Sequence, residues 1–212
     1  MDVRRTVLVS ILPLLLALGA FAQGKPLLVC FGDSITAGLG LASGESYPDA
    51  LRRDLNKLGY PYQVVNLGTS GATTKDAVER LPEVLRMHPS VVIVEFGGND
   101  GLRGLPLSVT AQNLDKVLAT LLHAHIRVLL AGITLPPNYG PDYIHSFDEV
   151  FRKAAARTRV AFVPMIYKDL IHVPGTIQPD GIHPTAKGSE ILARTLLPAL
   201  EPLLRKRRPA SR

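Results

Sequence analysis

Three side chains in this 212-residue sequence have the chemistry needed for acyl transfer: Ser34, Asp180 and His183. A serine hydroxyl becomes a good nucleophile when a neutral imidazole accepts its proton, and that imidazole needs a carboxylate to hold its tautomer. Asp180 lies only a few residues before His183, so a single loop can bring the carboxylate to the ring. We therefore predict that Ser34 is the nucleophile, His183 its base and Asp180 the partner of the imidazole.

Cleavage of an acyl bond also requires N–H donors for the oxyanion. The candidates are the backbone N–H groups of Ser34 and Gly71 and the side-chain amide of Asn99. A glycine lets the backbone approach a ligand closely. Gly68 is an alternative to Gly71, but the spacing between Asn66 and Gly71 favours Gly71. The competing interpretation is that Ser34 only caps a helix and that Asn99 only closes a turn.

Strand-like and helix-like patterns alternate along the chain. Short apolar runs predict strands at residues 26–31, 63–67, 90–96, 128–133 and 160–163. Helical spacing of apolar residues predicts helices at residues 47–58, 74–87, 108–124, 142–157 and 185–204. Residues 97–107, 134–141 and 167–180 are expected to be irregular. Strands separated by helices form βαβ units, so we predict an α/β domain with three α/β/α layers around a five-stranded parallel sheet.

The predicted sheet would bring the candidate residues together. Open parallel sheets bind ligands at the carboxyl ends of their strands. Ser34 follows the first predicted strand, Gly71 the second and Asn99 the third, while Asp180 and His183 come after the fifth. The sequence therefore predicts one site at this edge of the sheet.

The sequence resembles a known family at the same positions. Residues 32–38 read Gly-Asp-Ser-Ile-Thr-Ala-Gly and are similar to the first block of the GDSL, or SGNH, hydrolases. The letters S, G, N and H are matched in order by Ser34, Gly71, Asn99 and His183. The resemblance implies a flavodoxin-like sheet, no metal, no cofactor and a serine esterase mechanism with an acyl-enzyme intermediate.

Two further segments, residues 95–104 and 135–140, are similar to the bacterial arylesterase, thioesterase I and lysophospholipase L1 subgroup. This likeness implies aryl or alkyl esters, acyl thioesters or lysophospholipids as substrates, and a loop at residues 101–106 that moves over the acyl chain. We expect these residues to bind substrate: Gly101, Leu102, Leu105, Leu135 and Tyr139. Ordinary loop packing is the alternative for them. For the whole protein, the alternatives are a carbohydrate acetyl esterase and a non-catalytic lipid carrier.

The two ends of the chain differ from its middle. Residues 1–22 combine Arg4 and Arg5, an apolar run and a terminal Ala-Phe-Ala, which predicts a signal peptide cleaved after Ala22 and an exported, periplasmic or secreted protein. An uncleaved membrane anchor is the alternative. Residues 23–204 are expected to form one domain, with residues 205–212 as a basic, disordered tail.

Charge and composition limit the kinds of partner that we expect this protein to bind. The net charge of +6 is concentrated in the tail, which could contact anionic membrane surfaces weakly. The rest of the chain has no basic stripe, so nucleic acid is not an expected partner. The other histidines lack the spacing of metal ligands, so we expect no metal site. The single cysteine, Cys30, lies in an apolar run and is expected to be a buried thiol. The expected partner is a small-molecule or lipid ester; the oligomeric state is not predicted.

Overall fold

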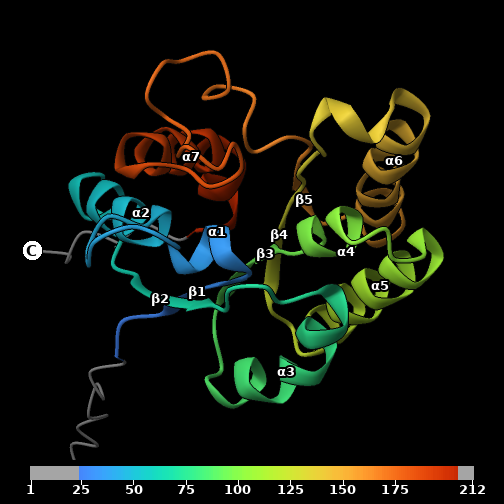
Figure 1. The fold of residues 1–212 in the computed structure, drawn as a ribbon. Helices are drawn as coiled ribbons and strands as arrows, with labels where there is room; N and C mark the ends of the chain where they lie inside the picture. Colours follow the sequence, from blue (N-terminus) through green and yellow to red (C-terminus); the bar gives the residue numbers. More distant parts are fainter. Residues whose placement is uncertain (1–23, 205–212) are drawn as a thin grey trace, which may run out of the picture.

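A five-stranded parallel sheet forms the centre of the protein (Figure 1), in a computed structural model that describes residues 24–204. The strands are β1 Leu27–Gly32, β2 Gln63–Gly68, β3 Val91–Glu95, β4 Arg127–Ala131 and β5 Ala161–Val163. Their order is β2-β1-β3-β4-β5, and all neighbouring pairs are parallel. This order is the flavodoxin-like one. The predicted sheet is confirmed, with strand ends that differ by one or two residues.

Helices cover both faces of the sheet. The longer ones are α2 Tyr47–Lys57, α3 Thr74–Arg86, α5 Leu107–His123, α6 Pro141–Thr158 and α7 Ala186–Leu200. Helices α2 and α7 pack together on one face, while α3, α5 and α6 lie on the other (Figure 1). The predicted three-layer α/β/α architecture is therefore confirmed. All residues of β3 are buried, as expected for the central strand of such a sheet.

Three short helices were not predicted. The helix α4 Gly98–Leu102 and the 3-10 helix η1 Pro137–Tyr139 occupy segments that were expected to be irregular, and α1 Ser34–Ala37 follows β1 in a segment for which no element was predicted. The closing helix was expected to reach residue 204, but α7 ends at Leu200 and the 3-10 helix η2 Glu201–Leu203 follows. Pro202 explains this end, because a proline has no N–H for an α-helical hydrogen bond and its ring clashes with the preceding turn.

Local sequence signals set several helix ends. Gly59, with a φ of +78°, follows α2 as a left-handed residue. The N–H groups of Gly59 and Tyr60 donate to the carbonyls of Asn56 and Leu55, which closes the last turn. At the start of α3, Thr73 and Asp76 form a reciprocal capping box. These helices are therefore defined by short-range contacts as well as by packing on the sheet.

The carboxyl ends of β1 and β3 mark the point where the chain changes direction across the sheet. From β1 the chain first adds β2 on one side and then β3 on the other. Such a switch point leaves a crevice in which ligands of α/β proteins bind. The backbone N–H of Asp33 donates to the carbonyl of Glu95 at 3.2 Å, so these two strand ends are joined directly below the crevice.

The predicted signal peptide, residues 1–22, and the basic tail, residues 205–212, lie outside the described residues. Within residues 24–204, no helix is both long and apolar enough to cross a bilayer.

Candidate active site

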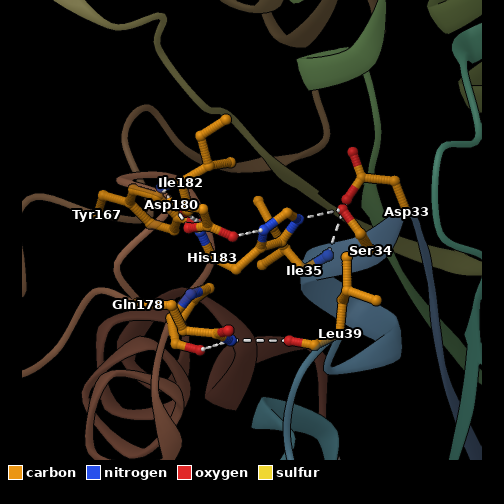
Figure 2. A network of polar contacts seen from close by, with 10 residues as sticks. Asp33, Ser34, Ile35, Leu39, Tyr167, Gln178, Asp180, Ile182 and His183 are labelled. Atoms are coloured by element: carbon orange, nitrogen blue, oxygen red, sulfur yellow. Dashed lines mark hydrogen bonds and ion pairs between the residues drawn. The ribbon is translucent and has the colours of Figure 1, made fainter.

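Ser34, His183 and Asp180 form a continuous row of hydrogen bonds (Figure 2). The Oγ of Ser34 lies 2.8 Å from Nε2 of His183, and Nδ1 of the same ring lies 2.6 Å from Oδ2 of Asp180. With the proton of the neutral ring on Nδ1, Nε2 is free to accept the hydroxyl proton. The structure thus brings together the three residues that the sequence analysis singled out.

The tight turn from β1 into α1 positions Ser34. Asp33 is the N-cap of α1, and its Oδ1 accepts a hydrogen bond of 2.9 Å from the N–H of Ile35. Ser34 is therefore the first residue of the helix rather than its cap. Gly32 precedes the turn at a place with no room for a side chain, because a Cβ there would lie 2.0 Å from Oγ1 of Thr36. In the Gly-Asp-Ser sequence, the glycine is therefore required by the lack of space, and the aspartate caps the helix that begins with the serine.

Hydrogen bonds of Gln178 and Tyr167 position the loop that carries His183. The side-chain amide of Gln178 donates to the carbonyl of Leu39, close to the nucleophile, and to the carbonyl of Pro184 (Figure 2). The N–H of Gln178 donates to the carbonyl of His183 at 2.8 Å. The hydroxyl of Tyr167 donates to the carbonyl of Ile182, also at 2.8 Å. The loop that carries the imidazole is therefore fixed on both sides of the ring.

Asp180 remains ionised beside the imidazole. Partial burial by itself would raise its pKa, but the hydrogen bonds from the His183 ring and from the N–H groups of Ile182 and His183 outweigh it. They lower the pKa of Asp180 to about 2. The two N–H groups both donate to Oδ1, so Oδ2 is left for the ring. A fixed negative charge at this place favours the imidazolium that forms when the base takes a proton.

Gly71 and Asn99 line the same cavity as Ser34. Gly71 has a φ of +79°, a conformation that side-chain-bearing residues rarely adopt. The guanidinium of Arg103 donates to its carbonyl oxygen at 2.9 Å and thereby fixes this peptide. The Nδ2 of Asn99 donates to the carbonyl of Ala72 at 2.9 Å and to Oδ2 of Asp33 at 3.2 Å. The residues predicted to supply the oxyanion donors therefore line one cavity together with the serine.

A cavity of about 620 Å³ opens next to the serine, and most of its lining is apolar. Of the five residues expected to bind substrate, Leu102 and Leu135 line it, whereas Gly101, Leu105 and Tyr139 do not. Gly101 is packed below the cavity, where a Cβ would lie 2.6 Å from Phe147. Tyr139 contacts the cavity wall without lining the cavity, because its hydroxyl donates to the carbonyl of Leu102 at 2.8 Å. Leu105 lies on the surface.

Much of the cavity wall was not anticipated. The additional apolar lining residues include Ile35, Leu39, Met165, Tyr167, Ile171 and Ile182. Most of them come from the irregular segment after β5, whose sequence shows neither a helical nor a strand period. His172, one of the histidines that the sequence analysis assigned no role in the site, also lines the cavity. The adjacency of Ile35 to the nucleophile was the one local signal that could have indicated its position.

The described residues contain no group of three or more His, Cys, Asp or Glu side chains arranged to hold a metal ion. Cys30 is fully buried in β1, as expected, and burial raises the pKa of its thiol to about 12. A thiol that stays protonated is not a nucleophile.

A parallel α/β sheet with a serine, an imidazole and a carboxylate in a row at its switch point defines a serine hydrolase of the three-layer type. Comparison with known proteins gives the family. The model of the GDSL-like lipase/acylhydrolase family matches residues 30–191, and the chain belongs to this family.

Curated relatives agree with this assignment. Esterase TesA of Pseudomonas aeruginosa is 40% identical over 201 residues, which cover 94% of this chain and 100% of the relative. An arylesterase of Vibrio mimicus is 34% identical, covering 86% of this chain and 92% of the relative. The thioesterase 1/protease 1/lysophospholipase L1 of Escherichia coli K12 is 35% identical, covering 86% and 87%. The chain is therefore a serine esterase.

Solved structures show the same fold. The crystal structure of TesA matches with a TM-score of 0.81 and 41% identity, over 84% of this chain and 99% of that one. AlinE4, an SGNH-hydrolase family esterase, matches with a TM-score of 0.71 and 38% identity, over 83% and 95%.

Proposed function

We propose that this esterase cleaves carboxylic esters and thioesters with Ser34 as nucleophile, His183 as general base and Asp180 as the residue that orients and stabilises the imidazole. The observation that carries the proposal is the unbroken row from Oγ of Ser34 through both ring nitrogens to Oδ2 of Asp180, at the mouth of an apolar cavity. A psychrotrophic esterase from Pseudoalteromonas, 26% identical with a TM-score of 0.78, has been crystallised inhibited by monoethylphosphonate, which supports a serine nucleophile.

In the first half of the reaction, the Ser34 hydroxyl attacks the substrate carbonyl while its proton passes to Nε2 of His183. The resulting oxyanion lies among the N–H groups of Ser34 and Gly71 and the amide of Asn99, each of which contributes about 3 kcal/mol of transition-state stabilisation. The imidazolium then gives its proton to the leaving alcohol or thiol, and the acyl group remains on Ser34. In the second half, His183 removes a proton from water as the water attacks the acyl-enzyme; the imidazolium then returns this proton to Oγ of Ser34 as the acyl–oxygen bond breaks and the acid is released.

The cavity favours an acyl chain over a sugar. Its wall near the nucleophile is made of aliphatic side chains such as Leu102, Leu135 and Ile182. Such a wall removes apolar surface from water but offers few hydrogen bonds to hydroxyl groups. We therefore place the acyl chain of an aryl or alkyl ester, an acyl thioester or a lysophospholipid in this cavity, and regard a carbohydrate acetyl esterase as the less favoured alternative.

Two variants test the proposal. Ser34→Ala and His183→Ala should each reduce kcat for a p-nitrophenyl ester by about 10⁴-fold or more, because the nucleophile or its base is lost. A fluorophosphonate probe should label the native protein at Ser34 and leave Ser34→Ala unlabelled. His145→Ala, on the exposed surface of α6, is the matched control and should keep native activity. Near-native turnover by either active-site variant would refute these roles, and a native protein without esterase activity or label would support a lipid carrier.

We further propose that the protein is exported with removal of residues 1–22, and that residues 205–212 bind anionic membranes weakly. The support is in the sequence: the tripartite leader at one end and the basic run at the other. N-terminal sequencing of the protein from cell fractions tests the first statement. Sedimentation with anionic and neutral vesicles, with and without the tail, tests the second.

A further inference from the structure

Two carboxyl groups are buried directly beneath the nucleophile turn: Asp33 is 2% exposed and Glu95 is 1% exposed. Oε2 of Glu95 accepts hydrogen bonds from Oγ1 of Thr36 at 2.7 Å and from the N–H of Asp33 at 3.4 Å. Oε1 of Glu95 is also buried but receives no donor within the described part of the chain. A buried carboxylate oxygen without a donor is costly, so the environment of Oε1 does not suit an ionised group.

A proton on Glu95 accounts for this environment. Asp33 and Glu95 lie close enough for their side chains to interact directly, and two neighbouring buried carboxyl groups are more stable with one proton between them than with two negative charges. Burial, followed by the negative charge of Asp33, raises the pKa of Glu95 well above its usual range. Burial also raises the pKa of Asp33, but hydrogen bonds from Ile35 and Glu95 limit the rise to about 6. The surroundings of the pair therefore favour a proton on Glu95 and a negative charge on Asp33.

Other ionisable groups surround this pair without reversing the order. Asp100 raises the pKa of Asp33 and His183 lowers it. The pKa values of the buried phenols of Tyr47 and Tyr167 are raised, mainly by burial and in addition by the negative charges of the pair. Both phenols are thus neutral. The surrounding groups therefore still favour one proton and one negative charge on the pair.

The ionised member of the pair touches the oxyanion site. Oδ2 of Asp33 accepts a hydrogen bond of 3.2 Å from Nδ2 of Asn99, whose other amide hydrogen bonds to the carbonyl of Ala72 at 2.9 Å. An ionised carboxylate can only accept, so it requires the NH₂ end of the amide to face it. A protonated Asp33 would no longer require the NH₂ end of the amide, and the carbonyl of Ala72 would then be the one remaining acceptor that holds the amide in this orientation.

We propose that Glu95 is a positioning residue for ester hydrolysis: as a neutral carboxylic acid it holds the proton of the buried pair, so that Asp33 stays an acceptor and keeps Nδ2 of Asn99 turned toward the reacting carbonyl. Of the two hydrogen bonds of Nδ2, the one to Asp33 is the longer, at 3.2 Å against 2.9 Å, and in the proposal its N–H is shared with the oxyanion once the oxyanion forms. The inference rests on the proposed function, since it assigns Asn99 to the oxyanion site.

Two uncharged variants of similar length separate this role from simple packing. In Glu95→Gln the amide NH₂ replaces the acid O–H as donor to Asp33, and the amide oxygen still accepts from Thr36. In Glu95→Met both functions are lost. We expect Glu95→Gln to keep kcat within about threefold of the native value, and Glu95→Met to lose about 10-fold or more in kcat with little change in KM. Glu190→Gln and Glu190→Met, on the exposed face of α7, are the matched controls.

Equal kcat values for the two Glu95 variants would overturn the proposal, whether both values stay near that of the native protein or both are reduced. Circular dichroism and thermal melting show whether Glu95→Met is folded. If it is not, infrared difference spectroscopy on the native protein decides: at neutral pH we expect the C=O band of a buried protonated carboxylic acid, absent from Glu95→Gln. No such band would overturn the proposal. Fluorophosphonate labelling of the native protein at Ser34 distinguishes this failure from a failure of the proposed function.

Discussion

At the scale of single residues, each group assigned to the chemistry is held by contacts with neighbouring groups of the protein. Asp33 caps the turn that carries Ser34, and the N–H groups of Ile182 and His183 occupy one oxygen of Asp180. The carbonyl of Ala72 holds the amide of Asn99. Groups fixed in this way need not reorganise when charge develops, and preorganised dipoles are generally the largest contribution to such catalysis.

The contacts of Asp180 make the outcome of Asp180→Asn predictable. Its Oδ1 accepts from two backbone N–H groups, so an amide oxygen would take that place and the NH₂ would face Nδ1 of His183. Nδ1 would then have to accept, which puts the ring proton on Nε2, where it can no longer accept from Ser34. We expect kcat to fall by about 10³-fold or more with little change in KM.

Steady-state kinetics on a p-nitrophenyl ester measure this effect, with Asp142→Asn at the start of α6 as the control. Because the pKa of Asp180 is lowered to about 2, its charge is present at every ordinary assay pH, and the loss should be seen throughout the profile. A kcat above about one tenth of the native value would show that Asp180 does not set the tautomer.

The residues that sequence alone indicated are those with a chemically distinctive type at a strand end. Ser34 and Asn99 could be predicted in this way, and His183 from its closeness to Asp180 in the chain, although the distances between these side chains could not. The role of Glu95 could not be predicted, because in the sequence it is only the last residue of a β-branched run. Its role depends on Asp33 and Thr36, which come to lie beside it through the pairing of β1 with β3. Arg103 likewise gains its role from a contact with Gly71 across the site.

At the scale of elements, long periodic segments were predictable and short ones were not. Helices such as α3 and α5 show several turns of apolar spacing, whereas α1 and α4 have 4 and 5 residues and cannot display a period. These two short helices nevertheless carry Ser34 and Asn99. Each is instead defined by contacts: α1 by its Asp33 cap, and α4 by Asp100, whose carboxylate accepts from the N–H and hydroxyl of Thr74 in α3.

The carboxyl end of α4 is attached to η1 and α6 by two tyrosines, which leads to a prediction about the cavity. Tyr139 donates to the carbonyl of Leu102 at 2.8 Å, and Tyr143 donates to that of Gly101 at 3.3 Å. Since Leu102 lines the cavity, Tyr139→Phe should loosen this wall by about 1 kcal/mol, the net value of one hydrogen bond. We expect a rise in KM of about fivefold for long acyl esters and little change for acetate esters.

Kinetics on p-nitrophenyl esters of increasing chain length test this expectation. Tyr143→Phe is the matched control, because it removes the same atom from a longer hydrogen bond and should have the smaller effect. If Tyr139→Phe changed acetate and long-chain esters equally, the contact would serve general stability and not the shape of the cavity.

At the scale of the whole molecule, the switch point between β1 and β3 has two consequences. It opens the crevice in which the site lies, and it places the ends of two central strands so close that Asp33 and Glu95 are buried together. Alternation of strands and helices, together with the family resemblance, was enough to predict this topology. The buried proton beneath the site was not predictable, because it results from packing between segments distant in sequence.

The buried proton should also be visible in the pH dependence of stability. In the unfolded chain Glu95 loses its proton near its usual pKa of 4.5, while the folded protein keeps it to a higher pH. The folded state then binds one proton more than the unfolded state, so the stability contributed by this group is complete below pH 4.5 and is lost as pH rises toward the raised pKa. The loss is about 1.4 kcal/mol per pH unit.

Glu95→Gln has no proton to lose at this position. Its free energy of unfolding, measured in urea at a series of pH values from about 5 toward the raised pKa of Glu95, should therefore increase relative to that of the native protein by about 1.4 kcal/mol per pH unit. The slope of the difference is diagnostic, because changes in packing shift both curves by an amount that does not depend on pH. A difference that stayed constant across this range would mean that Glu95 is ionised in the folded protein, and that Asp33 does not owe its charge to a proton held by its neighbour.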